Sequence, residues 1–235
     1  PAVGFVDAVL AGLAPDGGLY VPESWPAFTH DEIAAFRGKP YAHVAAEVLS
    51  RFAGDELPRD AVDAMCEEAY ATFAHAAVVP LVQISPDAFV AELFHGPSLA
   101  FKDVAMQLLA RLYDHVLAGQ NRVQTILCAT SGDTGGAAVE AFRGRAHVRV
   151  CALFPEGRIS EVQRRFMTTA SESNVRCVAV QGTFDDCQAI VKAAFQDRSL
   201  RQAVDLTGVN SINWGRALAQ VVYYFTSAVS LGAPH

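Results

Sequence analysis

The amino-acid sequence predicts an α/β protein in which a parallel, twisted sheet is flanked by helices and follows a mainly helical region. Two observations carry this prediction. In the second part of the chain, apolar runs of strand length alternate with single segments of helix length, and strands joined by single helices form parallel sheets through right-handed crossovers. In the first part, apolar residues recur at helical spacing. We therefore expect two domains, residues 1–78 and residues 79–235.

The first region is expected to contain four helices. Apolar residues recur at helical spacing from Phe5 to Leu13, and the breaker cluster at 15–18 would end that helix. Residues 19–22 are expected to be extended and to lead into a surface loop. Asp60 or a neighbouring residue would cap the fourth helix. The remaining helices are expected over Thr29–Phe36, Tyr41–Phe52 and Arg59–Ala74.

The second region is expected to begin with two short strands around a Ser-Pro-Asp turn. A loop then leads into a long amphipathic helix, after which strands and helices alternate. The strands are expected at 81–84, 88–93, 124–129, 148–154 and 175–180, and the helices at 102–117, 135–142, 160–170, 184–196 and 221–229.

The distribution of charge along the chain indicates which classes of ligand the protein can bind. The net charge is −7, which argues against a nucleic-acid-binding protein. Residues 1–78 carry a net charge of −8 and residues 79–235 a net charge of +1, so an anionic small molecule is expected to bind the second region. No apolar run approaches the roughly 18 residues that a membrane-spanning helix needs. The first residues also lack the basic leader of a signal peptide, and we expect no membrane partner.

The cysteines and histidines predict neither disulfides nor a metal site. Five cysteines form an odd set without a C-x-x-C pair, and three of them lie in apolar, strand-like runs. Reduced, buried cysteines of a cytoplasmic protein are expected. The seven histidines include no H-E-x-x-H or other paired spacing.

A glycine-rich turn at 130–138, T-S-G-D-T-G-G-A-A, follows an apolar strand and opens a helix. Unpaired backbone N–H groups and the helix dipole make such a turn a site for an anion. The segment matches neither G-x-G-x-x-G nor the lysine-containing phosphate loop, so the sequence does not predict a dinucleotide or ATP site. The alternative is an ordinary strand-to-helix turn capped by Ser131 or Asp133.

Lys102 is the second candidate for chemistry. The chain has three lysines against fifteen arginines, and Lys102 stands in an apolar stretch with Gly96 and Pro97 at the start of a helix. Desolvation there would favour a neutral, nucleophilic amine, which a Schiff-base lysine requires. The alternative is a helix lysine whose ammonium group pairs with Asp103 or with solvent.

Four segments together resemble the threonine synthase family. They are D-G-G-L-Y-V-P at 16–22, E-L-F-H-G-P-S-L-A-F-K-D at 92–103, the turn at 130–138 and N-S-I-N-W-G-R at 210–216. They follow the family's order, and the second is highly specific, whereas related dehydratases and cysteine synthase carry loops similar to S-G-D-T-G. The resemblance implies a fold type II pyridoxal-phosphate enzyme, similar to the β-subunit of tryptophan synthase. Such an enzyme would convert O-phospho-L-homoserine and water into L-threonine and phosphate.

The resemblance also implies which residues meet the cofactor. Lys102 would hold pyridoxal 5′-phosphate as a Schiff base and then move protons at Cα and Cβ of the substrate, with the pyridine ring as the electron sink. Phe101 would pack near that ring. Asp133 occupies the position where relatives often carry Asn near the 3′-oxygen of the cofactor. An Asp there changes the protonation that this hydrogen bond requires, which leaves its role open.

Residues of both loops are expected at the substrate. By resemblance, Ser131, Gly132 and Thr134 would receive the substrate carboxylate, in agreement with the predicted anion site. Ser98 and His95 would add polar groups, although His95 fits a structural role equally well.

The last segment leaves its roles open. Asn210 or Ser211 would cap the final helix at least as readily as either would bind substrate, and Asn213 lies beside them. Arg216 would contact a phosphate or form a surface ion pair.

The family's glycine-rich phosphate loop, of the G-N-F-G type, does not occur before His235. The Ser or Thr partner of the pyridine nitrogen is expected in the same missing portion. We therefore expect residues 79–235 to be the first part of the cofactor-binding domain of a longer enzyme, with residues 1–78 as an accessory domain. The alternatives are another enzyme of this cofactor family, such as a serine or threonine dehydratase, and a non-catalytic protein or inactive fragment that binds a phosphorylated metabolite. Oligomerisation is left open.

Overall fold

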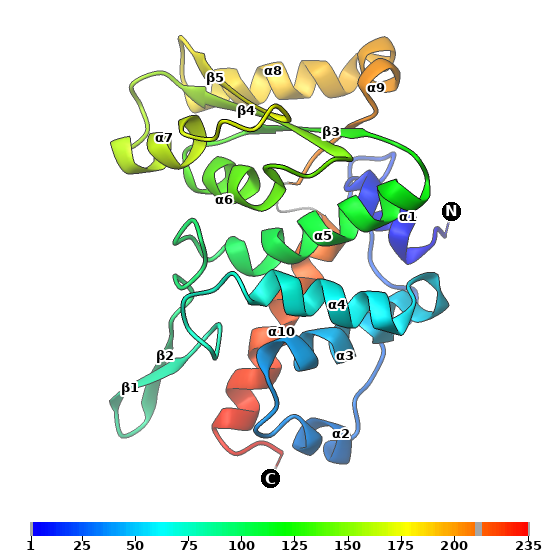
Figure 1. Cartoon of the computed structure of the whole chain (residues 1–235), viewed down its shortest axis with the longest axis vertical. Coiled ribbons are helices and arrows are strands. Elements are labelled where there is room, and N and C mark those ends of the chain that lie inside the picture. The colour runs from blue at the N-terminus through cyan, green and yellow to red at the C-terminus, as the bar shows by residue number, and fades with distance from the viewer. Residues whose placement is uncertain (1, 210–212, 235) are drawn as a thin grey trace.

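The computed structural model describes residues 2–209 and 213–234. Figure 1 shows a sheet with helices on both faces above a group of helices, with a hairpin at the lower left. The parallel sheet and its flanking helices confirm the predicted fold class. No helix within the described ranges is both long enough and apolar enough to cross a membrane.

Three of the four predicted helices of the first region, α1, α2 and α4, end earlier than the sequence predicted, and α3 ends one residue later. α1 stops at Gly12, which takes a φ of 71° that favours glycine. α4 begins after Pro58, and its first turn has no side-chain cap. The predicted cap, Asp60, instead accepts a hydrogen bond from the Ala61 amide. The elements of this region are α1 (Phe5–Ala11), α2 (His30–Ala35), α3 (Tyr41–Ala53), the 3-10 turn η1 (Gly54–Glu56) and α4 (Arg59–Tyr70).

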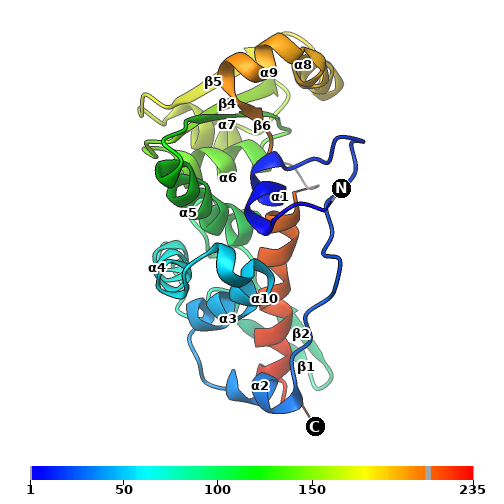
Figure 2. The same cartoon turned by 90° about the vertical axis from the view of Figure 1, so that its right-hand side faces the viewer.

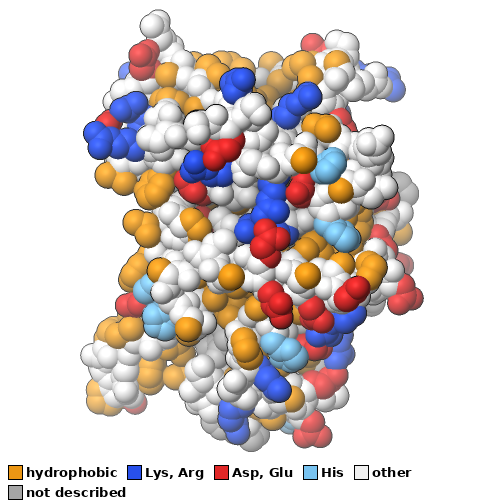
Figure 3. All heavy atoms as spheres, viewed as in Figure 1, with side chains coloured by type: hydrophobic (Ala, Val, Ile, Leu, Met, Phe, Trp, Pro, Cys, Tyr) orange, Lys and Arg blue, Asp and Glu red, His pale blue; other side chains and the backbone are white. Residues whose placement is uncertain are grey.

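A two-stranded antiparallel hairpin follows, formed by β1 (Leu81–Ser85) and β2 (Ala88–Ala91). Val82, Ile84 and Phe89 of this hairpin expose their side chains. Figure 3 shows apolar side chains gathered over it at the lower left. The chain then enters α5 (Asp103–Gly119), which is buried along most of its first three turns.

Four parallel strands build the sheet in the order β5-β4-β3-β6. The helices α6 and α7 pack together on one face, and α8 covers the other face against β3 and β4 (Figure 1). The elements are β3 (Gln124–Ala129), α6 (Asp133–Phe142), β4 (Val148–Pro155), α7 (Glu161–Thr168), β5 (Val175–Val180) and α8 (Phe184–Gln196).

Two short elements that the sequence does not predict follow α8. Asp197 ends α8 and caps the next helix, α9 (Arg198–Val204), because its side chain accepts a hydrogen bond from the Leu200 amide at 3.0 Å. The two-residue strand β6 (Leu206–Thr207) then pairs with β3 at the edge of the sheet.

The last helix, α10 (Trp214–Ser230), connects the two ends of the molecule. It is longer than predicted and packs against α5, α3 and α1. Figure 2 shows it running from below the sheet down to α2, beside the extended segment that joins α1 to α2. Edge-to-face contacts of Trp25 with Trp214 and of Phe28 with Phe225 hold this segment on α10.

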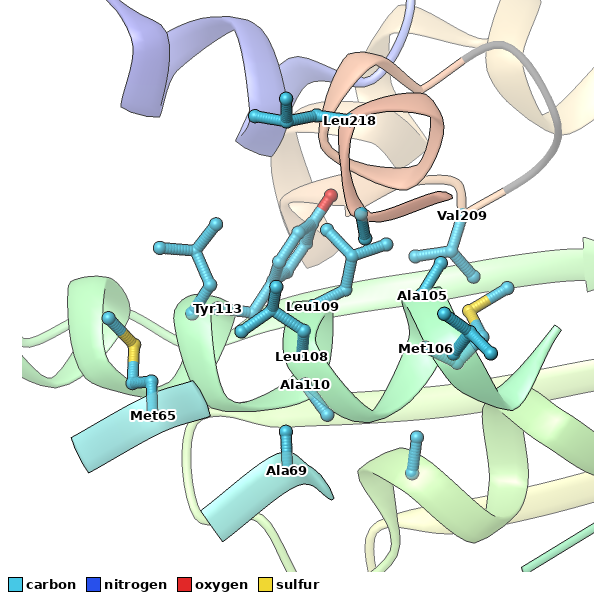
Figure 4. Packing of buried hydrophobic residues seen from close by; sticks show 14 of the residues in the cluster. Met65, Ala69, Ala105, Met106, Leu108, Leu109, Ala110, Tyr113, Val209 and Leu218 are labelled. Atoms are coloured by element: carbon cyan, nitrogen blue, oxygen red, sulfur yellow. The ribbon is translucent and has the colours of Figure 1, made fainter. Parts of the chain in front are cut away.

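Tyr113 lies at the centre of the core, among side chains from α4, α5 and α10 (Figure 4). Its hydroxyl donates to the Val9 carbonyl at 2.8 Å, and the Asn213 amide donates to the same oxygen at 2.8 Å. Thr207 donates to the neighbouring Leu10 carbonyl. These buried bonds satisfy the end of α1 and join it to α5, β6 and α10.

Candidate functional site

The two loops singled out by the sequence meet in the structure. The Lys102 amine lies 3.3 Å from Oδ2 of Asp133, although the two residues are 31 positions apart. Lys102 is the residue before α5, so the helix fixes its backbone, and its side chain is only 15% exposed. The amine also lies 4.4 Å from the centre of the exposed Phe101 ring, which is a cation–π distance. The alternative prediction was that the Lys102 ammonium group pairs with Asp103 or with solvent. In the structure it pairs with Asp133 instead.

Gln163, which none of the functional motifs includes, contacts the other carboxylate oxygen of Asp133. Nε2 of Gln163 donates to Oδ1 of Asp133 at 2.5 Å. Gln163 belongs to the motif Ser160-x-x-Gln163, a capping box that starts α7. The motif is visible in the sequence, but the contact across to the glycine-rich turn is not.

The glycine-rich turn is organised by Thr130. The first residue outside α6 is Gly132, and no side chain caps the helix there, so neither Ser131 nor Asp133 acts as the predicted cap. Instead the buried Thr130 hydroxyl accepts hydrogen bonds from the amides of Gly132, at 2.9 Å, and Gly135, at 2.8 Å. Gly132 has a φ of 132°, a conformation that side-chain-bearing residues rarely adopt.

Three amides of this turn remain available to a ligand. Among the described residues, the amides of Ser131, Asp133 and Thr134 have no hydrogen-bond acceptor. Two of them are the first N–H groups of a helix, where the dipole favours negative charge. Ser131 is exposed and Thr134 partly exposed, so their hydroxyls are accessible as well. The turn can therefore bind a small anion such as a carboxylate.

The loop before Lys102 is fastened by Asp103, which is fully buried. Its carboxylate accepts from the hydroxyl and from the amide of Ser98, both at 2.7 Å. Burial raises the pKa of Asp103 to about 6, against the effect of the bonds from Ser98. A side chain at Gly96 would overlap the Asp103 carboxylate. Ser98 is therefore buried and bonded within the loop, and its contact with substrate stays a prediction.

His95 is tied into the protein. Its Nε2 lies 2.8 Å from a Glu92 carboxylate oxygen, its ring lies against the rings of His75 and Phe94, and its carbonyl accepts from the Ala74 amide. These contacts account for His95 structurally.

Arg216 is buried at the start of α10, which excludes the predicted surface ion pair. Its Nη1 donates to the Val209 carbonyl at 3.3 Å, and burial lowers its pKa. Within the described part of the chain, its Nε has no hydrogen-bond partner. Asn213 caps α10 by accepting from the Arg216 amide. Asn210 and Ser211 lie outside the described residues.

A cavity of about 550 Å³ lies between β3 and α8, beside the first turn of α6. Thr134 borders it, together with the mostly apolar side chains of Cys128, Phe195 and Leu13. Neither Lys102 nor Asp133 lines it. The contact between Lys102 and Asp133 is therefore separate from this cavity.

Comparisons with known proteins bear on this arrangement. A family model described as "Threonine synthase N terminus" matches residues 1–70. The curated threonine synthase of Pseudomonas aeruginosa is 51% identical over 235 residues, which is 100% of this chain and 50% of that protein. The threonine synthase of Escherichia coli is 42% identical, covering 97% of this chain and 52% of that protein.

Solved structures of threonine synthases match the chain as well. The crystal structure of pyridoxal-phosphate-bound threonine synthase from Brucella melitensis matches with a TM-score of 0.96 and 58% identity, over 100% of this chain and 50% of that one. The yeast threonine synthase structure matches with a TM-score of 0.92 and 37% identity, over 100% and 48% of the two chains.

The fold and these matches define the architecture of a fold type II pyridoxal-phosphate enzyme. Its first 70 residues match the model of the threonine synthase N terminus, and the whole chain is similar to about half of the threonine synthase of Pseudomonas aeruginosa. It spans about half the length of the curated relatives that it matches.

Proposed function

We propose that the protein to which this chain belongs is a threonine synthase, a lyase that converts O-phospho-L-homoserine and water into L-threonine and phosphate. The observation that carries this proposal is the contact of Lys102 with Asp133, because it joins the two loops that resemble this family at one place. We further propose that Lys102 binds pyridoxal 5′-phosphate through a Schiff-base linkage, and that the enzyme acts in the cytoplasm. The division of the chain at residues 78 and 79 is part of the same proposal.

The residues around Lys102 fit this cofactor. A primary amine on a fixed backbone can condense with an aldehyde, and a carboxylate 3.3 Å away can take up or return a proton. Phe101 offers an exposed apolar ring beside the amine. Gly132 leaves space at the turn, since a Cβ there would overlap the side chain of Gln163.

The bound cofactor would supply an electron sink that makes proton removal from substrate carbon possible. Lys102 would carry those protons, because its amine is mobile at the end of four methylene groups while its backbone is fixed. The unpaired amides and hydroxyls of Ser131 and Thr134 would bind the substrate carboxylate. The buried Arg216 guanidinium is a candidate for the substrate phosphate, because it faces no carboxylate among the described residues.

The linkage to Lys102 can be tested directly. The complete protein should show a visible absorption band with pyridoxal phosphate, and borohydride should fix the cofactor on the peptide that contains Lys102. Lys102→Ala should lose the fixed adduct and lower activity by roughly 10³-fold or more. Lys192→Ala is the matched control, since Lys192 lies on α8 and does not contact Asp133. Fixation that persists in Lys102→Ala would refute the assignment.

The reaction itself can be separated from that of a dehydratase by its products. A threonine synthase releases phosphate from O-phospho-L-homoserine, whereas a dehydratase releases ammonia from threonine or serine. Ammonia without phosphate would overturn the proposed activity and leave the lysine assignment intact.

A further inference from the structure

The capping box of α7 fixes which end of the Gln163 side-chain amide faces Asp133. Its amide oxygen accepts from the Ser160 hydroxyl at 3.0 Å and from the Ser160 amide at 3.4 Å. The Ser160 hydroxyl in turn accepts a hydrogen bond from the backbone N–H of Gln163 at 3.2 Å. With the oxygen engaged, the amide nitrogen is directed at Asp133, 2.5 Å away.

Capping alone does not explain why this residue is a glutamine. The capping boxes of α2 and α8 carry Glu32 and Asp186 at the same position. A carboxylate there satisfies the cap and also suits the positive end of the helix dipole. In α7, however, the far end of the side chain meets the carboxylate of Asp133. A glutamate would place two carboxylates in contact, whereas an amide donates a hydrogen bond.

The glycine-rich turn makes room for this contact. A Cβ at Gly132 would overlap the amide of Gln163, so a residue with a side chain would displace the amide from Asp133. Gly132 and Ser160 therefore both support the same bond from Gln163. The opposite oxygen of Asp133 lies 3.3 Å from the Lys102 amine.

We infer that Gln163 is a positioning residue, which holds the side chain of Asp133 against the Lys102 amine. This inference extends the proposed function, and it rests on that function for the role of the Lys102 amine in the reaction. Among the described residues, Asp133 is the charged group that pairs with Lys102. Glu161, the other acid at the start of α7, pairs with Arg164 and Arg165.

The test measures how the reactivity of the Lys102 amine changes with pH, and it needs no cofactor. The complete protein is freed of bound aldehyde with hydroxylamine and labelled with acetic anhydride across a range of pH. Labelling of the Lys102 peptide is then read by mass spectrometry. Gln163→Glu keeps a capping box of the kind seen in α2 and adds a negative charge beside Asp133. The labelling midpoint should rise by about one pH unit, so that Lys102 is labelled about tenfold less at roughly pH 8.

Two further variants keep the inference falsifiable. Asp186→Asn changes the equivalent cap of α8, far from Lys102 in the chain, and should leave the Lys102 profile unchanged. Asp133→Asn combined with Gln163→Glu moves the negative charge from the residue that contacts Lys102 to the residue behind it, and should lower the midpoint below that of the wild type. A Gln163→Glu midpoint within about 0.3 pH units of wild type, or an equal change in Asp186→Asn, would overturn the inference. The labelling is done without the cofactor, so its outcome does not depend on the proposed function. Failure of the proposed function would appear in the separate experiment with pyridoxal phosphate, as a missing visible band.

Discussion

At the scale of single residues, the loop before Lys102 depends on one buried acid. Asp103 accepts two hydrogen bonds from Ser98 and lies directly after Lys102 in the chain. From the sequence alone, Asp103 is a possible ion-pair partner of Lys102. The structure turns its carboxylate away, into the loop, where it fixes the backbone that carries the lysine.

Asp103 predicts a pH dependence of stability. Burial raises the pKa of this acid from 3.8 to about 6, so the folded chain binds its proton more tightly than the unfolded chain does. The free energy of unfolding should therefore fall as the pH rises from about 4 to about 6, by roughly 2 to 3 kcal/mol at most. Asp103→Asn should remove this part of the dependence. Guanidinium unfolding of both proteins at several pH values measures it, and parallel curves would contradict the prediction.

At the scale of elements, the turn between β3 and α6 is fixed by a threonine. Thr130 is 1% exposed, and its hydroxyl accepts from two backbone amides that have no other partner among the described residues. The turn therefore keeps its shape through a side chain that precedes the glycines. Of the two caps that the sequence offered, Ser131 is exposed and can face a ligand, whereas the side chain of Asp133 contacts Lys102 and Gln163.

Thr130→Val tests this arrangement. Valine keeps the shape of threonine but leaves two buried amides without an acceptor, which should lower the free energy of unfolding by about 2 to 4 kcal/mol. Thr130→Ser is the matched control, because it keeps the oxygen, and it should cost about 1 kcal/mol for the lost methyl group. Chemical unfolding of the two variants checks both numbers. Equal losses in the two variants would show that packing, and not the hydroxyl, fixes the turn.

The elements themselves were predictable where the pattern was long. Strands β3, β4 and β5 and the helices between them follow from alternating apolar runs, and Lys102 and the glycine-rich turn follow from motifs. The short elements α9 and β6 were missed, because a strand of two residues has no periodicity and depends on its pairing with β3.

The side-chain partners were less accessible than the elements. Gln163 and Asp133 are 30 positions apart, and a sequence pattern does not show which distant side chains touch. The burial of Arg216 was missed for the same reason, since it follows from how α10 packs on the rest of the chain.

At the scale of the whole molecule, α10 returns from the sheet to the first helices and makes one core of both regions (Figure 2). Tyr113, Val9 and Asn213 join three elements of that core through buried hydrogen bonds. The hairpin β1–β2 lies at the edge of this core, against which only its last residue, Ala91, packs among the described residues. Its strands expose apolar side chains, and Ile84 is 65% exposed (Figure 3).

This contrast predicts unequal stability within a polypeptide of residues 1–235. A two-stranded hairpin without a covering layer is marginally stable in water, whereas α5 is buried along the face that includes Met106 and Leu109. Amide hydrogens of residues 81–91 should therefore exchange with deuterium at least about 100-fold faster than those of residues 104–113. Mass-spectrometric hydrogen exchange measures both segments in one sample, so α5 is the internal control. Equal protection of the two segments would mean that the hairpin derives stability from contacts other than its own strand pairing.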